Sequence, residues 1–198
     1  MPDAMTIQAL LDDPLILALV GGALLLLLVL LLLQRARRRG SLSARLRRAC
    51  LDILTDIVVP DGEGGQMHLD YVLLTPEGVV LLDLRDVEGH VFGSNTMQDW
   101  TVLAEKRRFT FANPQHALHD RVAVVKRLLP DVRVKGIVAF TSRALFTKGM
   151  PEHVVKADDY VEELGAGVSD TEVPGLRDAW DRLRSEAVSA QVGRLMSD

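Results

Sequence analysis

The stretch from Gln66 to Arg85 reads QMHLDYVLLTPEGVVLLDLR and decides the fold. Two runs within it, Met67–Leu74 and Val79–Arg85, are rich in the apolar and β-branched residues that are typical of strands. Between them, Thr75–Gly78 has proline at its second position and glycine at its fourth, which fits a type I turn. The sequence therefore predicts a β-hairpin here.

The turn also sets the register of the hairpin, placing Asp70 opposite Asp83 and His68 opposite Arg85. Because residues two apart in a strand share a face, all four side chains are expected on the same side of the sheet. Directly opposite residues have Cβ atoms about 4.5–5.5 Å apart, and like charges at that distance repel each other. The pairing therefore predicts either a solvated face or a site that binds a cation.

Two carboxylates so placed can share Mg²⁺ or Mn²⁺, which prefer oxygen ligands. The candidate metal ligands are Asp70 and Asp83, and Arg85 can neutralise one of them or clamp a phosphate. The alternative is a wet face on which water separates the acids. A slip of one residue in the register would also separate the set.

Outward from the hairpin, the sequence predicts helices and further strands. A helix is expected from Ser41 to about Asp56, because apolar residues recur there at helical spacing, and Pro60–Gly65 is expected as a connector. The other expected elements are strands near residues 100–104 and 107–112, a helix from Asn113-Pro114 to about Leu129, a buried strand at Val134–Thr141, a short strand at Val154–Val155, a helix starting at Asp158-Asp159 and a last helix from Pro174 to about Leu195. This order predicts an α/β domain with a mixed sheet.

The segment from Leu15 to Leu33 is an uncharged apolar run of 19 residues. As a helix it would span roughly 28 Å, close to the hydrocarbon thickness of a bilayer. A cleaved signal peptide is the alternative, but the preceding tail has no basic residue and no small-residue cleavage site follows. The predicted organisation is a tail at 1–14, a transmembrane helix at 15–33, a basic juxtamembrane segment at 34–48 and a domain at 49–198, with its core at about 41–142.

Charge predicts both the topology and the character of the domain. Seven arginines lie between Arg35 and Arg48, after the apolar run, and three acids precede it. Because basic flanks stay cytoplasmic, the amino terminus is expected outside and the domain in the cytoplasm, as at a bacterial inner membrane, with the arginines near anionic lipid. The remaining 24 acidic and 16 basic residues give the domain a net charge of −8, which provides no general attraction for nucleic acid.

The hairpin sequence resembles the NERD (nuclease-related) domain, a family related to the restriction-endonuclease-like fold. The resemblance rests on the segments 68–74 and 78–85, continues through Gly89-His90-Val91-Phe92-Gly93 and Trp100, and reaches Asn113-Pro114. It covers roughly residues 41–142. It implies that Asp70 and Asp83 match metal-binding acids and that Arg85 matches a lysine that activates or positions the attacking water.

Several positions depart from the family pattern. Asp83 stands where the family has Glu, and Arg85 stands where it has Lys and cannot act as a base. The helix 41–54 lacks the family's Glu, and Ala117 replaces the Gln of Asn-Pro-x-x-Gln, with Gln115 nearby. Two functions are therefore expected: a membrane-anchored, metal-dependent nuclease (a hydrolase using magnesium or manganese), or a catalytically degenerate binding or scaffolding domain.

Other signals in the sequence have ordinary explanations. Cys50 is the only cysteine, so an internal disulfide is excluded and a small core residue is expected. His116, His119 and Asp120 are spaced as a helical metal site or as a wet helix face. The basic clusters at 106–108 and 126–127 fit a phosphate-binding cleft or scattered surface charge.

Overall fold

The computed structural model describes residues 22–23, 26, 41–105, 107–166 and 174–189. The chain divides into two units, 1–41 and 42–198. In the first unit Gly22, Ala23 and Leu26 are helical, and the rest of the predicted span at 15–33 lies outside the described residues. Of the helices that are described, none has the length and apolar character needed to cross a membrane.

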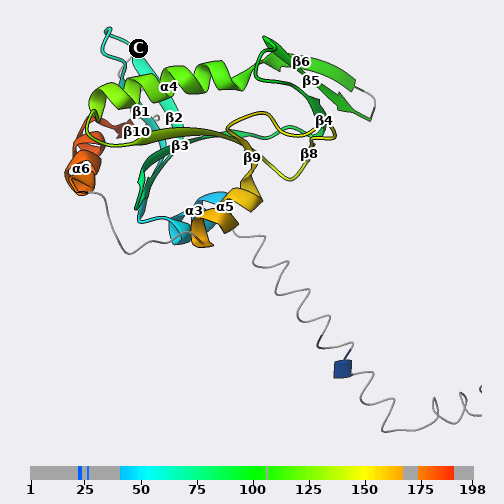
Figure 1. The fold of residues 1–198 in the computed structure, drawn as a ribbon, viewed down its shortest axis with the longest axis horizontal. Helices are drawn as coiled ribbons and strands as arrows, with labels where there is room; N and C mark the ends of the chain where they lie inside the picture. The colour runs from blue at the N-terminus through cyan, green and yellow to red at the C-terminus, as the bar shows by residue number, and fades with distance from the viewer. Residues whose placement is uncertain (1–21, 24–25, 27–40, 106, 167–173, 190–198) are drawn as a thin grey trace, which may run out of the picture. The chain divides into compact units, whose positions relative to one another are not determined.

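The second unit is built on a six-stranded mixed sheet, which confirms the predicted α/β class (Figure 1). The strands β3, β7 and β9 run parallel to one another, and β10, β1, β2 and β3 pair antiparallel. Their order across the sheet is β10 (Val188–Ser189), β1 (Asp52–Pro60), β2 (Gln66–Thr75), β3 (Gly78–Arg85), β7 (Val134–Phe140) and β9 (Val154–Lys156).

A second sheet of four strands follows the hairpin, and sequence reasoning did not foresee it as a separate layer. Its strands lie in the order β6 (Arg107–Ala112), β5 (Asp99–Ala104), β4 (Gly89–Phe92) and β8 (Ala144–Leu145). The strand predictions at 100–104 and 107–112 are confirmed. Trp100 on β5 is fully buried and stacks on Phe140 of β7, so the two sheets share one core.

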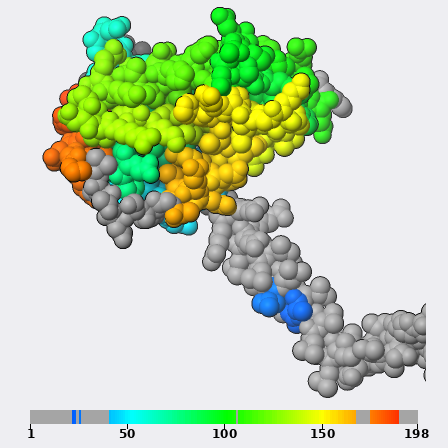
Figure 2. All heavy atoms as spheres, viewed as in Figure 1, coloured from blue at the N-terminus to red at the C-terminus, as the bar shows by residue number. Residues whose placement is uncertain are grey.

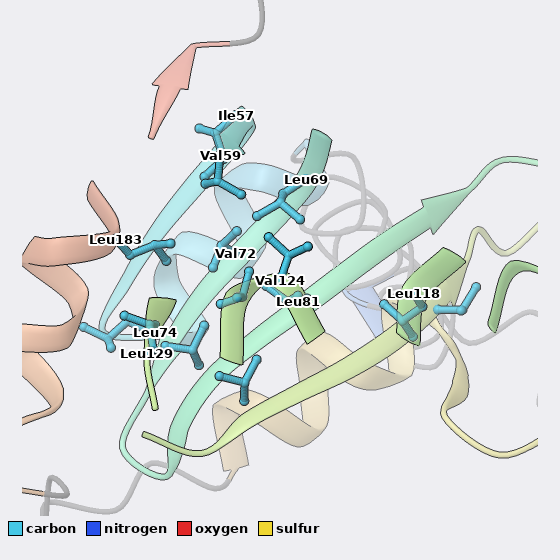
Figure 3. Packing of buried hydrophobic residues seen from close by; sticks show 14 of the residues in the cluster. Ile57, Val59, Leu69, Val72, Leu74, Leu81, Leu118, Val124, Leu129 and Leu183 are labelled. Atoms are coloured by element: carbon cyan, nitrogen blue, oxygen red, sulfur yellow. The ribbon is translucent and has the colours of Figure 1, made fainter. Parts of the chain in front are cut away.

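Helices cover both faces of the large sheet (Figure 1). On one face, α4 (Pro114–Leu128) and α6 (Leu176–Glu186) bury Leu118, Val124 and Leu183 in the larger apolar cluster (Figure 3). On the other face, α3 (Leu42–Ala49) and α5 (Ala157–Ala166) enclose a smaller cluster around Leu46 and Tyr160. The sheet therefore separates two cores.

The hairpin register is as predicted. Leu74 pairs with Val79, and the ladder runs to the pair formed by Tyr71 and Leu82. The backbone pairing ends there, one step before Asp70 and Asp83. The two acids consequently occupy the point at which β2 and β3 separate.

The helix predicted over Ser41–Asp56 is wrong in its second half. The helix ends at Ala49, and β1 begins at Asp52. Ile53 and Ile57, which had been placed on a helical face, belong to a strand whose apolar side chains lie on both sides of the sheet. The spacing is compatible with either element, and the β-branched content of 53–59 together with pairing to β2 decides for the strand.

The remaining predictions hold with shifted boundaries. Asn113 caps α4 through its side-chain oxygen, which accepts a hydrogen bond from the Gln115 N–H at 2.9 Å, and Pro114 occupies the first turn. The last helix is shorter than predicted: it spans Leu176–Glu186, and Val188–Ser189 then pairs with β1 as β10. The end of that prediction, residues 190–195, lies outside the described residues.

Candidate functional site

Asp83 is a buried acid near the end of β3. It follows Val79 and Leu81 at intervals of two, so it lies on the face that α4 covers, and its side chain is 4% exposed. Its Oδ2 accepts a hydrogen bond from the Arg85 guanidinium at 2.7 Å and lies 3.5 Å from Nη1 of Arg121. A carboxylate so deep in the protein is expected to need such charged partners.

Asp70 lies beside Asp83 on the facing strand. Its Oδ2 accepts a hydrogen bond from the backbone N–H of Leu84 at 3.0 Å, so a side chain continues the pairing where the backbone ladder stops. Burial and then hydrogen bonding with Asp70 raise the pKa of Asp83 above its ordinary value, against the opposing attraction of Arg85 and Arg121. The two carboxyl groups therefore converge, as the register predicts.

A change of face in β2 brings a third acid to the site. Val72 and Leu74 point into the larger core, but so do Leu69 and Met67, so the alternation reverses at Asp70. In the ladder between β1 and β2, the residues before and after Asp56 are paired with those after and before Asp70, but Asp56 and Asp70 are not paired with each other. Asp56 also has a φ of 51°, in the left-handed region. The local irregularity is thus shared by both strands.

His68 links the two acids at this irregularity. Its Nε2 is 2.8 Å from Asp56 Oδ1, and its Nδ1 is 3.5 Å from Asp70 Oδ1. The prediction that His68 shares a face with Asp70, Asp83 and Arg85 is wrong, because Leu69 takes the core-facing place and leaves His68 44% exposed. His68 reaches the group from the side, through Asp70.

Arg121 of α4 completes the group and was not foreseen from the sequence. Its Nε donates a hydrogen bond to the backbone carbonyl of His68 at 2.9 Å, and its Nη1 faces Asp83. Arg121 lies four residues after Ala117, and therefore on the same side of the helix as the position at which the family has Gln. That helical spacing was the available signal; the signal for Asp56 was hidden by the wrong helix assignment.

The surroundings of the two acids differ in openness. Asp83, Asp70 and Arg121 line a crevice of about 10 Å³ between the hairpin and α4, which has room for about one water. Asp70 also lines an open hollow of about 380 Å³ with Asp56 and Tyr71. Asp70 is accordingly reached from solvent, whereas Asp83 lies behind it.

The donor set fits a hard divalent cation. Two convergent carboxylates supply the oxygen ligands that Mg²⁺ and Mn²⁺ prefer, and their mutual repulsion would be relieved by such an ion. Within the described residues, no group of three or more His, Cys, Asp and Glu side chains is arranged as a metal site. Asp70 and Asp83 would therefore hold a cation together with water or a ligand.

Two other polar groups from the sequence have structural partners. Gln115 is buried, and its Nε2 donates to the Glu152 carbonyl at 2.7 Å and to Asn95 Oδ1 at 3.0 Å. The capped start of α4 does not shift, so Gln115 does not move into the place of Ala117. In the basic cluster 126–127, Arg127 donates to the Asp61 carbonyl at 2.7 Å.

A pocket of about 280 Å³ lies elsewhere, between the start of β1, the hairpin turn and α5. Cys50 lines it, and burial raises the pKa of this thiol to about 11. A thiol with so high a pKa stays protonated at neutral pH and is a poor nucleophile. Cys50 is therefore not a candidate nucleophile in this pocket.

Comparison with known proteins identifies the family of this chain. The pattern of the nuclease-related domain (NERD) matches residues 36–141, a range that holds the hairpin, both acids and α4. An uncharacterized protein of Bacillus anthracis is 22% identical over 77 residues, which are 39% of this chain and 36% of that protein, so the chain spans about a third of that relative's length. No solved structure matches significantly. Because the family pattern covers more than half of the chain, this protein belongs to the nuclease-related (NERD) domain family.

Proposed function

We propose that this protein is a membrane-anchored nuclease that hydrolyses phosphodiesters with Mg²⁺ or Mn²⁺ at Asp70 and Asp83. Membership of the nuclease-related family supports a nuclease-like function at the family level. The proposal of metal-dependent hydrolysis at Asp70 and Asp83 rests on the convergence of the two carboxyl groups beside Arg85, at the open end of the hairpin. Convergent acids with a neighbouring guanidinium are suited to metal-assisted phosphoryl chemistry.

Each side chain has a role that follows from its position. Asp70 and Asp83 would hold the cation, which when bound would polarise the phosphate and lower the pKa of a water. Arg85 remains protonated and contributes charge stabilisation to the phosphate, not proton abstraction. The Leu84 N–H and His68 hold Asp70 in place through its two oxygens.

An assay of the full-length chain in mild detergent, with DNA and RNA substrates and either Mg²⁺ or Mn²⁺, tests this function. Cleavage should fall at least about a hundredfold in Asp83→Ala, since one metal ligand is lost. The matched control is Asp86→Ala, because Asp86 is an exposed acid on the same segment that pairs with Arg143. Cleavage that survives Asp83→Ala would exclude the assigned site.

The second candidate is a catalytically degenerate domain that binds or scaffolds partners at the inner membrane. Two observations favour a degenerate site: Arg85 and Arg121 both contact Oδ2 of Asp83, and the crevice beside Asp83 is narrow. Calorimetric titration with Mn²⁺ separates the candidates. Stoichiometric binding that is lost in Asp70→Ala supports the nuclease, and no binding by the native chain, either alone or with a phosphodiester that resists cleavage, supports the scaffold.

The proposed location is a single membrane pass at 15–33, with the amino terminus outside and the domain in the cytoplasm. Anionic lipid is the proposed partner of the arginines between Arg35 and Arg48, although Arg45 forms an ion pair with Asp158 of α5 and is committed within the domain. The protein should stay with membranes after an alkaline carbonate wash. Release by that wash would contradict the membrane anchor.

A further inference from the structure

Asp83 has two arginine partners from different elements, and this arrangement has a consequence for ligand binding. Arg85 comes from the same strand, whereas Arg121 comes from α4 and contacts Asp83 only because the helix packs on the sheet. Both guanidiniums address the same oxygen, Oδ2. A cation that used this oxygen would have to displace them.

The charges balance without a cation. Next to Asp83, which is 4% exposed, Asp70 and Asp83 supply two negative charges and the two arginines supply two positive charges. Asp56 is 55% exposed and is paired with His68, so it does not enter this balance. Adding a dication alone leaves a positive excess in a poorly solvated site, and adding a phosphodiester alone draws the arginines away from buried Asp83. Each of these single steps is costly because it leaves an uncompensated charge with little water around it.

The arginines also have the means to change partner. Arg85 is 34% exposed and Arg121 is 19% exposed, so both reach solvent. Within the described part of the chain, the buried Nε of Arg85 has no hydrogen-bond partner, so this guanidinium is only partly satisfied by Asp83. A planar guanidinium with free donors binds a phosphate group through two parallel hydrogen bonds.

We propose that Arg85 and Arg121 form a phosphodiester-operated lock on Asp83: they block the cation site in the free protein and move to the phosphate when a phosphodiester arrives. The cation and the phosphodiester then bind cooperatively, and Arg121 is a positioning residue for the metal ligand. This inference rests on the proposed function. It adds the prediction that an anionic phosphodiester, and not the metal alone, opens the site.

The test measures Mn²⁺ affinity by calorimetry on the full-length chain in detergent, with and without a phosphorothioate-linked thymidine dinucleotide that resists cleavage. The anionic dinucleotide should tighten Mn²⁺ binding at least about tenfold, and Mn²⁺ should tighten dinucleotide binding by the same factor. A methylphosphonate-linked dinucleotide has the same shape without the charge, and it should leave the Mn²⁺ affinity unchanged.

Arg121→Gln should bind Mn²⁺ at least about fivefold more tightly than the native chain without dinucleotide, and its coupling factor should fall toward one. The matched control is Arg127→Gln on the same helix, because Arg127 also donates to a backbone carbonyl but contacts the 61–65 loop instead of Asp83. This control should retain the native affinity and coupling. Circular dichroism establishes that both variants are folded, and the native-chain measurement needs no variant.

The outcomes separate this inference from the function on which it rests. Mn²⁺ binding that is lost in Asp70→Ala but does not respond to the dinucleotide or to Arg121→Gln overturns the lock and leaves the metal site standing. No Mn²⁺ binding by the native chain or by Arg121→Gln, with or without dinucleotide, overturns the metal site and the lock together.

Discussion

At the scale of single residues, the burial of the Asp83 carboxyl group beside a second acid reduces the stability of the folded protein. A carboxyl group that is 4% exposed has its pKa raised, first by burial and then by Asp70, in spite of two neighbouring arginines. When the pKa of an acid is higher in the folded protein than in the unfolded chain, the protein loses stability as the pH rises above the pKa of the unfolded chain. The reason is that the unfolded chain releases the proton more readily than the folded protein does. The acidic pair is thus a local cost to stability, and such costs are concentrated at functional sites.

Asp70→Asn should stabilise the protein at neutral pH by about 1 kcal/mol, because it removes the like charge that faces Asp83. The amide oxygen can still accept the hydrogen bond from Leu84 N–H. Urea denaturation at pH 7 and at pH 4 measures the effect, which should shrink as the pH falls, because the raised pKa of Asp83 favours uptake of a proton. Asp131→Asn, at an exposed acid, is the control, and an equal gain there would contradict the explanation.

The buried phenol of Tyr160 should make the stability of the protein depend on pH in the alkaline range as well. Burial, and then the charges of Glu163 and Glu77, raise the pKa of its phenol from 10.0 to about 12. Between these two values the unfolded chain has lost the proton and the folded chain retains it, so stability should fall by about 2 kcal/mol as the pH rises from 10 to 12. The Cys50 thiol, whose pKa is also raised, titrates in the same range, so the urea denaturation series uses a Cys50→Ala background. In that background Tyr160→Phe should remove most of this slope, and an unchanged slope would exclude Tyr160 as its source.

At the scale of elements, the end of β4 packs against β5 only because Gly93, the residue that follows β4, has no side chain. A Cβ at Gly93 would lie 2.2 Å from the ring of Trp100, which is fully buried. At Gly165 in α5, by contrast, a Cβ would meet no atom within 4 Å. The two glycines therefore predict opposite responses to the same substitution.

Gly93→Ala should destabilise the domain by about 2–3 kcal/mol, because Trp100 or the backbone must shift in a close-packed core. Gly165→Ala should stabilise it by about 0.5 kcal/mol through helix propensity. Thermal unfolding followed by circular dichroism measures both. A small effect at Gly93 would show that the indole ring has room to move.

At the scale of the whole molecule, the residues after the family match complete the core. The match ends at residue 141, yet β9 extends the large sheet and α5 and α6 cover its two faces. From α6, Trp180 is 3% exposed and donates from its indole nitrogen to Asp52 of β1 at 3.0 Å. In the space-filling view, the yellow chain that leads into β9 lies directly against the green part of the domain (Figure 2). The carboxyl-terminal part is accordingly structural to the domain.

Trp180→Ala should destabilise the domain by about 3–5 kcal/mol, the usual cost of removing a large buried ring. Asp181→Ala, at the next and exposed position of α6, should change stability by less than about 0.5 kcal/mol. Urea denaturation of the full-length chain gives both values. A small loss at Trp180 would mean that the contact between this ring and β1 contributes little to the stability of the domain.

The sequence by itself determined the features that depend on local order. The turn at Thr75–Gly78 and the alternation around it were enough to predict the hairpin, its register and the approach of Asp70 to Asp83. The capped start of α4 was likewise readable from Asn113-Pro114. These features depend on residues that are close together in the chain, so their turn and capping preferences and their spacing can be read from the sequence.

Only the tertiary structure decided the rest. Spacing alone cannot distinguish a helix from a strand at Ile53 and Ile57, and pairing with β2 settles that segment as β1. The approach of Arg121 to Asp83 spans 38 positions and exists because α4 packs across the hairpin. Contacts between distant segments depend on how faces are buried against each other, and that information is shared among all the elements that form the core.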